Sequence, residues 1–136
     1  MTPSRFTLQE ANDLLPYLAP LLVQLGALKG EHDRCQENVA ELTLKMRSNG
    51  HILENELRQT QEAMETAAAK ITELVERVQS YGCELKDMEV GLIDFPTVRD
   101  GRDVYLCWKL GEEHIAYWHD VESGYAGRQP LEDSRR

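Results

Sequence analysis

The sequence predicts an α+β protein: a long antiparallel helical hairpin with a short N-terminal helix, followed by a small antiparallel sheet of three to four strands. Two observations predict this. From residue 14 to residue 81, apolar positions recur at alternating steps of four and three, which keeps them on one helix face. After Gly82 the apolar period changes to two, as in strands. We expect a helical hairpin over 1–82, a β unit over 83–131 packed on the open end of the hairpin, and a frayed tail over 132–136.

Composition excludes several classes of protein. The 136 residues carry a formal charge of -9 and have a pI near 4.9, which disfavours nucleic acid and anionic membrane as partners. The sequence has neither an apolar leader nor a run of roughly 18 apolar residues that could span a bilayer. Three cysteines without a Cys-x-x-Cys pair favour reduced thiols. These features predict a cytoplasmic protein.

The N-terminal segment carries opposing signals for helix formation. Thr7 and Glu10 form a capping box, which predicts a helix that begins at residue 7 or 8, and Phe6 is placed to pack against Ala11. Pro16 and Pro20 each remove a backbone donor and disfavour helical geometry in the preceding residue. We therefore expect a break or kink between residues 14 and 20, which separates a short first helix from the hairpin.

The hairpin follows from two matching apolar series, called here the seam. A turn at Arg47-Ser48-Asn49-Gly50 would fold one series onto the other, as in a coiled coil. With the turn centred near Asn49, for example, Leu25 faces Leu74 and Val39 faces Thr60. The seam comprises Leu14, Leu18, Leu21, Leu25, Leu28, His32, Cys35, Val39, Leu42 and Met46, then Leu53, Leu57, Thr60, Met64, Ala67, Ile71, Leu74, Val78 and Tyr81.

The open end of the hairpin has more apolar surface than one partner helix can cover. Leu15, Leu22, Val23 and Val75 widen the apolar stripe there. The β unit, a second copy of the chain, or both could cover it, so these four residues are our candidate dimer or docking surface. We expect a homodimer, because a two-helix hairpin alone buries little surface. The alternative is an arm that holds another protein.

Two glycines lie inside the first long helix. Gly26 and Gly30 cost about 1 kcal/mol each relative to alanine in a helix interior. They indicate either a weak point or a place where another backbone comes close. We expect them to pack against Ala67-Ala68-Ala69 of the return helix.

Period-two patterning predicts strands over 83–90, 92–98, 103–110 and 114–120. Gly91, Asp100-Gly101 and Gly111-Glu112 mark the turns between them. With two-residue turns at the last two places, one face of the sheet is apolar and forms its core, comprising Ile93, Phe95, Val104, Leu106, Trp108, Ile115 and Tyr117. The other face would carry Asp94, Pro96, Tyr105, Cys107, Ala116 and Trp118.

The candidate ligand-binding residues all follow residue 90: Asp94, Trp118, His119, Asp120, Gly127 and Arg128. Asp94 lies in an apolar strand and needs a partner if it is buried, for which Lys109 or Arg128 could serve. Asp120 could hold one nitrogen of His119 while the other nitrogen faces a ligand. Gly127 and Arg128 could offer backbone donors and a guanidinium to an anion. The alternative is that these residues only stabilise the fold.

No metal or cofactor is predicted. His114 and His119, five apart on one strand, point to opposite faces, and the expected register groups Cys107 with His114 rather than with His119. His32 and Cys35 share a helix face on the seam, where they pack as core residues more often than they bind metal. Nucleophile-elbow, phosphate-loop and paired-cysteine zinc motifs are absent from the sequence. Whether the protein is an enzyme is uncertain, and a non-enzymatic role is favoured.

Five segments carry a resemblance to a known family: Gly82-Cys-Glu-Leu-Lys-Asp, Gly91-Leu-Ile-Asp-Phe-Pro, Val104-Tyr-Leu-Cys-Trp, Tyr117-Trp-His and Gly124-Tyr-Ala-Gly-Arg. With these, and with its opening Phe-Thr-Leu-Gln-Glu-Ala-Asn-Asp-Leu-Leu-Pro, the chain resembles a prokaryotic family, domain of unknown function family 2203. The resemblance implies the arrangement derived above and brings no activity, cofactor or catalytic residue.

Two functional hypotheses follow. The first is an interaction or scaffold protein that self-associates through its hairpin. The second is a protein that binds a small molecule or an anion, or a metal-assisted enzyme, with its site in the β unit.

Overall fold

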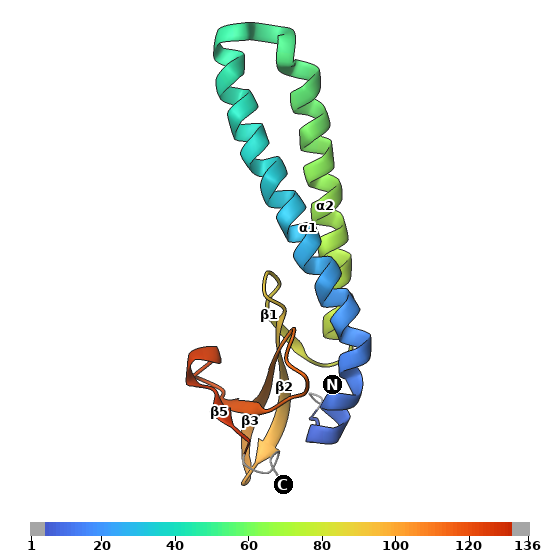
Figure 1. Cartoon of the computed structure of the whole chain (residues 1–136), viewed down its shortest axis with the longest axis vertical. Helices are drawn as coiled ribbons and strands as arrows, with labels where there is room; N and C mark the ends of the chain where they lie inside the picture. Colours follow the sequence, from blue (N-terminus) through green and yellow to red (C-terminus); the bar gives the residue numbers. More distant parts are fainter. Residues whose placement is uncertain (1–4, 132–136) are drawn as a thin grey trace.

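The computed structural model describes residues 5–131, apart from the side chains of residues 49, 50 and 52. Two long helices form a hairpin, and its open end, called here the base, carries a small sheet (Figure 1). The elements are α1 (Leu8–Asn49), η1 (Gly50–Leu53), α2 (Glu54–Ser80), β1 (Glu84–Asp87), β2 (Leu92–Arg99), β3 (Arg102–Lys109), β4 (Tyr117–Asp120), η2 (Tyr125–Gly127) and β5 (Gln129–Pro130). The α+β class is confirmed. The expected tail over 132–136 lies outside the described residues.

The predicted break in the first helix is wrong, because α1 runs without interruption through Pro16 and Pro20. Both prolines lie on its exposed side, so water can satisfy the carbonyls that lack a helical donor. On the opposite side, Leu15 and Leu18 are buried in the core. That burial keeps the helix continuous through the segment, and a separate short N-terminal helix does not form.

The start of α1 is as predicted. Thr7 Oγ1 accepts a hydrogen bond from the Glu10 amide at 3.0 Å, and Glu10 Oε1 accepts one from the Thr7 amide at 2.9 Å. The preceding residue ties this end to the sheet: the Phe6 amide donates to the Pro96 carbonyl at 2.8 Å, and the Phe6 and Phe95 rings meet edge to face. The beginning of the hairpin is therefore fixed on β2.

The seam is confirmed, because every one of its residues is buried or half-buried while most side chains between them are exposed. Asn38 Nδ2 lies 3.5 Å from Thr60 Oγ1 across the hairpin, one position from the predicted pairing. The turn lies later than expected. Helix α1 continues through Arg47 and Ser48 to Asn49, and η1 makes the reversal.

The sheet has five antiparallel strands in the order β1-β2-β3-β4-β5, one more than the upper prediction. The additional strand, β5, has only two residues and includes a proline, so periodicity could not reveal it. The two-residue turn at Asp100-Gly101 is confirmed: Arg99 pairs with Arg102, and both turn residues have positive φ, 53° and 77°.

The connection between β3 and β4 is longer than predicted, and as a result the side chains of β4 lie on the opposite faces of the sheet from those expected. It spans residues 110–116 instead of a two-residue turn, and Leu106 pairs with Trp118. Glu112 shapes this loop, since its amide donates to the Lys109 carbonyl and its Oε1 accepts from the Lys109 amide. A shift of one residue exchanges the two faces of a strand. Trp118 therefore lies on the core face, and Tyr117 and His119 lie on the other.

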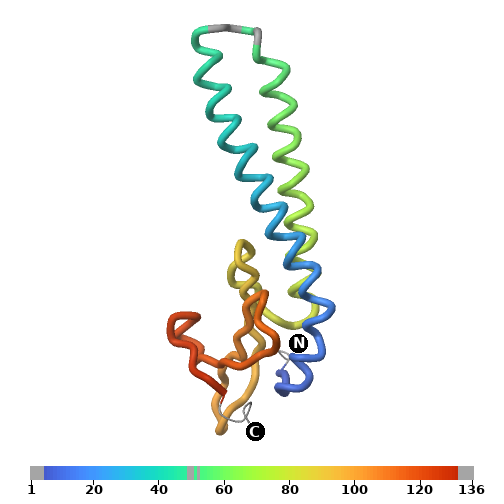
Figure 2. The backbone as a smooth tube through the Cα atoms, in the orientation of Figure 1, coloured from blue at the N-terminus to red at the C-terminus, as the bar shows by residue number. Residues whose placement is uncertain are grey.

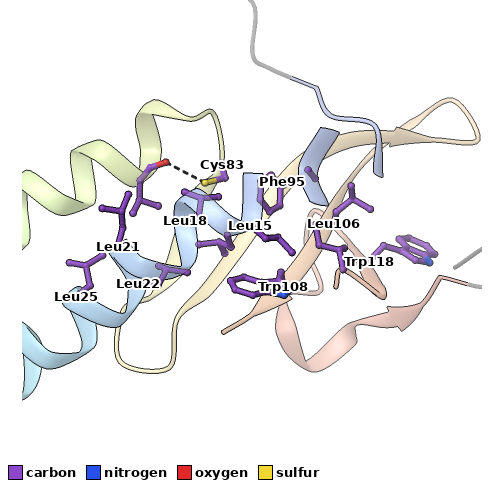
Figure 3. Packing of buried hydrophobic residues seen from close by; sticks show 14 of the residues in the cluster. Leu15, Leu18, Leu21, Leu22, Leu25, Cys83, Phe95, Leu106, Trp108 and Trp118 are labelled. Carbon is purple, nitrogen blue, oxygen red and sulfur yellow. Dashed lines mark hydrogen bonds between the residues drawn. The ribbon is translucent and has the colours of Figure 1, made fainter. Parts of the chain in front are cut away.

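The core lies at the base of the hairpin, between the two helices and one face of the sheet (Figure 3). Of the candidate docking residues, Leu15 and Leu22 are buried in this cluster and Val75 packs at its edge, whereas Val23 is 58% exposed. Figure 3 shows Leu15 and Leu22 near Trp108, and Cys83 donating to the Val78 carbonyl at 3.4 Å. The sheet of the same chain thus takes up most of the surplus apolar surface.

The glycine prediction is half right. A Cβ at Gly26 would lie 3.6 Å from the Glu89 carbonyl oxygen and 3.8 Å from that of Met88, so another backbone does approach. It is the β1–β2 turn rather than Ala67-Ala68-Ala69. A Cβ at Gly30 would meet only the side chain of Arg34, in its own helix.

Candidate functional site

Three polar side chains converge on the sheet face that points away from the core. Asp94 of β2, Cys107 of β3 and His119 of β4 each offer one potential ligand atom, and these atoms all lie within 4.8 Å of one another. The three residues are 2%, 0% and 2% exposed, respectively. Their neighbours Ile93, Leu106 and Trp118 point into the hydrophobic core, because successive side chains of a strand alternate between faces.

The strand register explains how they meet. Asp94 pairs directly with Cys107, while His119 pairs with Tyr105, one row further along the same face. The imidazole reaches across β3, and its Nε2 lies 2.9 Å from Asp94 Oδ2. The three residues therefore link the three central strands of the sheet.

The contact made by the second ring nitrogen, Nδ1, shows that this nitrogen of the imidazole carries a hydrogen. His119 Nδ1 lies 2.7 Å from the carbonyl oxygen of Asp120, which can only accept, so Nδ1 carries a hydrogen. The short contact between Nε2 and Asp94 Oδ2 then requires a further proton between the two atoms. The pair is either imidazolium with carboxylate or imidazole with carboxylic acid, and its net charge is zero in both forms.

One carboxylate oxygen of Asp94 is not used by His119. Within the described residues its Oδ1 is buried and accepts no hydrogen bond. A buried acceptor without a donor costs about 1–3 kcal/mol. Burial raises the pKa of the neighbouring Cys107 thiol to about 12, with a further contribution from the Asp94 carboxylate. The thiol is therefore protonated, and is a poor nucleophile, as long as nothing else binds it.

A second layer of side chains covers this group on the β1 side. Tyr105 of β3 reaches over β2, and its hydroxyl donates to Glu84 Oε2 of β1 at 2.7 Å. Its ring centroid lies 5.5 Å from that of His119. Lys86 Nζ completes the cover at 2.8 Å from Glu84 Oε1. The hydrogen bond to Glu84, and then burial, raise the pKa of Tyr105 to about 12.

Arg128 lies on the other side of the group. Its guanidinium sits between two rings, with its Cζ 4.0 Å from the Tyr117 centroid and 4.7 Å from that of Tyr125. One terminal nitrogen donates to Glu112 Oε1 at 3.0 Å and to the Cys107 carbonyl at 3.4 Å. Arg128 therefore holds the segment around η2 against β3 and β4.

The structure brings together only some of the predicted site residues. Asp94 and His119 meet, so the partner of Asp94 is His119 rather than Lys109 or Arg128, and Arg128 borders the pair. Asp120 contributes its carbonyl, while its carboxylate pairs with Arg102 at 3.2 Å near the surface. Trp118 faces the core, and the Arg99 Cζ atom lies 5.0 Å from the centroid of its ring.

The remaining predicted residue, Gly127, has a packing role. A Cβ there would lie 2.5 Å from that of Ser123, so glycine permits the tight turn of η2.

Sequence reasoning placed Cys107 on the same face as Asp94 but separated both residues from His119. The assumed two-residue turn at 111–112 had put His119 on the opposite face of the sheet, and this prediction is wrong. One signal could have corrected it. If β4 is shifted by one residue, both tryptophans, Trp108 and Trp118, point into the core, where large apolar side chains are usually buried.

The comparisons with known proteins give a family and no activity. The family described as Uncharacterized conserved protein (DUF2203) matches residues 4–131 of the chain. No curated protein and no solved structure matches it. Among the described residues, no helical stretch has the length and apolar character needed to cross a membrane.

Proposed function

Because the chain belongs to the DUF2203 family, whose description names no activity, we propose a function from the molecule itself: an interaction protein that self-associates through its hairpin arm. The hairpin arm is the part of the hairpin over residues 30–70, which projects beyond the sheet (Figure 2). The three free cysteines and the acidic composition fit a cytoplasmic role.

The observation that carries this proposal is the thin core of the hairpin arm. Of its described residues only Leu42 and Ala67 are buried, and neither belongs to the main core cluster at the base. The other seam residues are half-buried, and Leu44 is 61% exposed. Helical bundles usually reach a stable core with three or four helices, so two helices alone leave seam surface for another pair.

A second copy of the chain is the partner that fits best. The hairpin arm carries acidic and basic residues interspersed, for example Glu41 four residues before Lys45, which it contacts at 3.2 Å. The basic residues lower the repulsion between two such arms, although acidic residues are in the majority there. Four helices of similar length would then surround the half-buried seam, as in a four-helix bundle.

Light scattering coupled to size-exclusion chromatography tests the proposal over a range of concentrations. We expect the mass to double as concentration rises. Val39→Glu should weaken association at least about tenfold, because it places a charge on the half-buried seam of the hairpin arm. Leu44→Glu is the control, because Leu44 is 61% exposed on the side of α1 that faces away from the seam. A monomer at all concentrations, or equal effects of the two variants, would contradict self-association through the arm.

A second candidate function is the binding of a small anion in the β unit. It is favoured by one observation: Arg128 Nε is buried and donates no hydrogen bond within the described residues. Thermal-shift measurements with inorganic phosphate and with acetate would test it. A rise in melting temperature that is lost in Arg128→Gln supports anion binding, and no rise in the wild-type protein contradicts it.

A further inference from the structure

We infer that Asp94, Cys107 and His119 form a metal site that takes Zn²⁺, an ion that accepts nitrogen, sulfur and oxygen ligands together. This inference is independent of self-association, because the three residues lie on the sheet and the hairpin arm contributes none of them. It is carried by four observations: the donor set, the charge, the orientation of the imidazole and the free carboxylate oxygen.

The donor set suits zinc in type and spacing. One imidazole nitrogen, one sulfur and one carboxylate oxygen lie within 4.8 Å of one another. Zinc bonds of about 2.0–2.3 Å in a tetrahedron place such atoms about 3.3–3.7 Å apart. The ion would enter between Nε2 and Oδ2, which are now 2.9 Å apart and would separate by less than about 1 Å. The sulfur ligand disfavours Mg²⁺ and Ca²⁺, which prefer oxygen.

Charge balance favours a divalent cation. Metal ligands bind in their deprotonated forms, so a bound ion replaces the thiol proton of Cys107 and the proton shared by Asp94 and His119. A thiolate, a carboxylate and a neutral imidazole together carry two negative charges, which Zn²⁺ neutralises. Neutrality matters here because all three side chains are almost fully buried, where an uncompensated charge is costly.

The imidazole is already oriented as a ligand. In metal sites the second ring nitrogen of a ligating histidine usually donates to a carbonyl or a carboxylate, which fixes the ring. His119 Nδ1 makes this contact with the Asp120 carbonyl at 2.7 Å and leaves Nε2 directed at Asp94. The backbone of β4 therefore supplies the supporting contact that such a ligand needs.

The unpartnered oxygen of Asp94 can complete the coordination of the ion with a fourth ligand atom. Oδ1 is buried and accepts no hydrogen bond among the described residues, and the Asp94 side chain is only 3% exposed. A carboxylate that binds the ion through both oxygens would use Oδ1, and a bound water could donate to it instead. Either arrangement removes the cost of the unused acceptor.

The site is closed, which points to a structural ion. Tyr105 and Glu84 cover the group on one side and Arg128 borders it on the other. Structural zinc sites have their coordination filled by the protein, as it is here when Asp94 binds the ion through both oxygens, whereas catalytic sites keep a position open to water or substrate. An ion held here would cross-link β2, β3 and β4, so its binding free energy would add to the stability of the sheet.

The experiment uses the full chain, freed of metal with a chelator and then titrated with Zn²⁺ or with Co²⁺ as a spectroscopic substitute. We expect one ion per chain, a rise in melting temperature with Zn²⁺, and a sulfur-to-cobalt charge-transfer band with Co²⁺. Absence of both the band and the melting shift in the wild-type protein would overturn the inference and leave a metal-free ion pair packed against a thiol.

Variants locate the ion. Cys107→Ser should abolish the charge-transfer band, and Asp94→Asn and His119→Gln should each weaken Zn²⁺ binding at least about tenfold. Cys35→Ser is the matched control, because this half-buried cysteine of the seam lies beside His32 on the hairpin arm. The inference fails if Cys35→Ser removes the band and Cys107→Ser keeps it, since the ion would then bind the seam.

A measurement on the wild-type protein covers the case in which the buried variants do not fold. X-ray absorption of the zinc-loaded chain should show one sulfur and two or three nitrogen or oxygen atoms around the ion. A first shell without sulfur, or with more than one, would exclude Asp94, Cys107 and His119 as the ligand set.

Discussion

His119 and Asp94 lie on strands that are not neighbours, yet His119 Nε2 lies 2.9 Å from Asp94 Oδ2 across the intervening strand β3. Both side chains are almost fully buried, at 2% and 3% exposure. Removal of one partner from such a buried pair destabilises the protein, because the other partner is left buried without a compensating charge or hydrogen bond. The contact therefore couples the two halves of the sheet.

We expect strong coupling between these two residues in the metal-free protein. With a chelator present, Asp94→Ala and His119→Ala should each lower the free energy of unfolding by about 3–5 kcal/mol. The double variant should lose less than the sum, with a coupling of about 1–3 kcal/mol. Urea denaturation of the four proteins measures this. As a control, Arg102→Ala removes the exposed ion pair with Asp120 and should cost less than about 1 kcal/mol. Additive losses for Asp94 and His119 would show that the contact is not formed.

Tyr105 should titrate at unusually high pH. Its pKa is raised to about 12, first by the hydrogen bond to Glu84 and then by burial, whereas an unfolded tyrosine titrates near 10. A raised pKa means that folding favours the protonated phenol. Its contribution to stability is therefore complete below about pH 10 and is lost as pH rises towards 12.

Tyrosinate absorbance can isolate this residue. The chain has five tyrosines, so the titration of Tyr105→Phe is subtracted from that of the wild-type protein. The difference should have its midpoint near 12, and in a Glu84→Gln background it should move towards the ordinary value because the charged acceptor is gone. An unchanged midpoint in that background would rule out the Tyr105–Glu84 hydrogen bond as the cause.

Two turn glycines should differ in their tolerance of a methyl group. Gly91 and Gly101 have similar positive φ values, 74° and 77°, so alanine at either position meets a conformational cost of about 1–2 kcal/mol. At Gly101 the new Cβ meets nothing within 4 Å, whereas at Gly91 it would lie 2.7 Å from Leu110 Cβ. Gly91→Ala should therefore lower the free energy of unfolding by about 1–3 kcal/mol more than Gly101→Ala. Equal losses in urea denaturation would contradict this packing.

The base and the hairpin arm should differ in stability. Leu22→Ala removes a side chain from the main core cluster and should cost about 4–5 kcal/mol, while Leu42→Ala in the thin arm should cost nearer 2 kcal/mol. Amide hydrogen exchange should also show the arm opening at a lower free energy than the base. Both are measured at a concentration where light scattering gives a monomer. Uniform protection along α1 would contradict a weakly packed arm.

The hairpin could be predicted because its pattern is local and repeated. Each step of the seam from Leu14 to Tyr81 restates the same apolar face, so an error at one residue is corrected by its neighbours. The interruption expected at Pro16 and Pro20 was wrong because the effect of a proline is not purely local. Their effect depends on whether the freed carbonyls reach water, and the packing of Leu15 and Leu18 turned the prolines outward.

The polar site could be predicted only in part, because it depends on one loop. The sequence drew attention to Asp94 and His119, since an acid in an apolar strand needs a partner. Whether His119 joined Asp94 and Cys107 depended on the number of residues between β3 and β4. That number is set by contacts distant in sequence, including the Ile115 amide, which donates to Asn12 Oδ1 of α1 at 2.9 Å.

The amino-acid sequence by itself determined the two long helices, the β-strand periodicity after Gly82 and the Asp100-Gly101 turn, because helix period, strand period and positive φ are local properties. Tertiary structure alone decided that the sheet covers Leu15 and Leu22 at the base of the hairpin, and that His119 lies on the same face as Asp94 and Cys107. The physical reason is the two-residue period of a strand: a shift of one residue changes no local preference and exchanges every side chain between the core and the polar face.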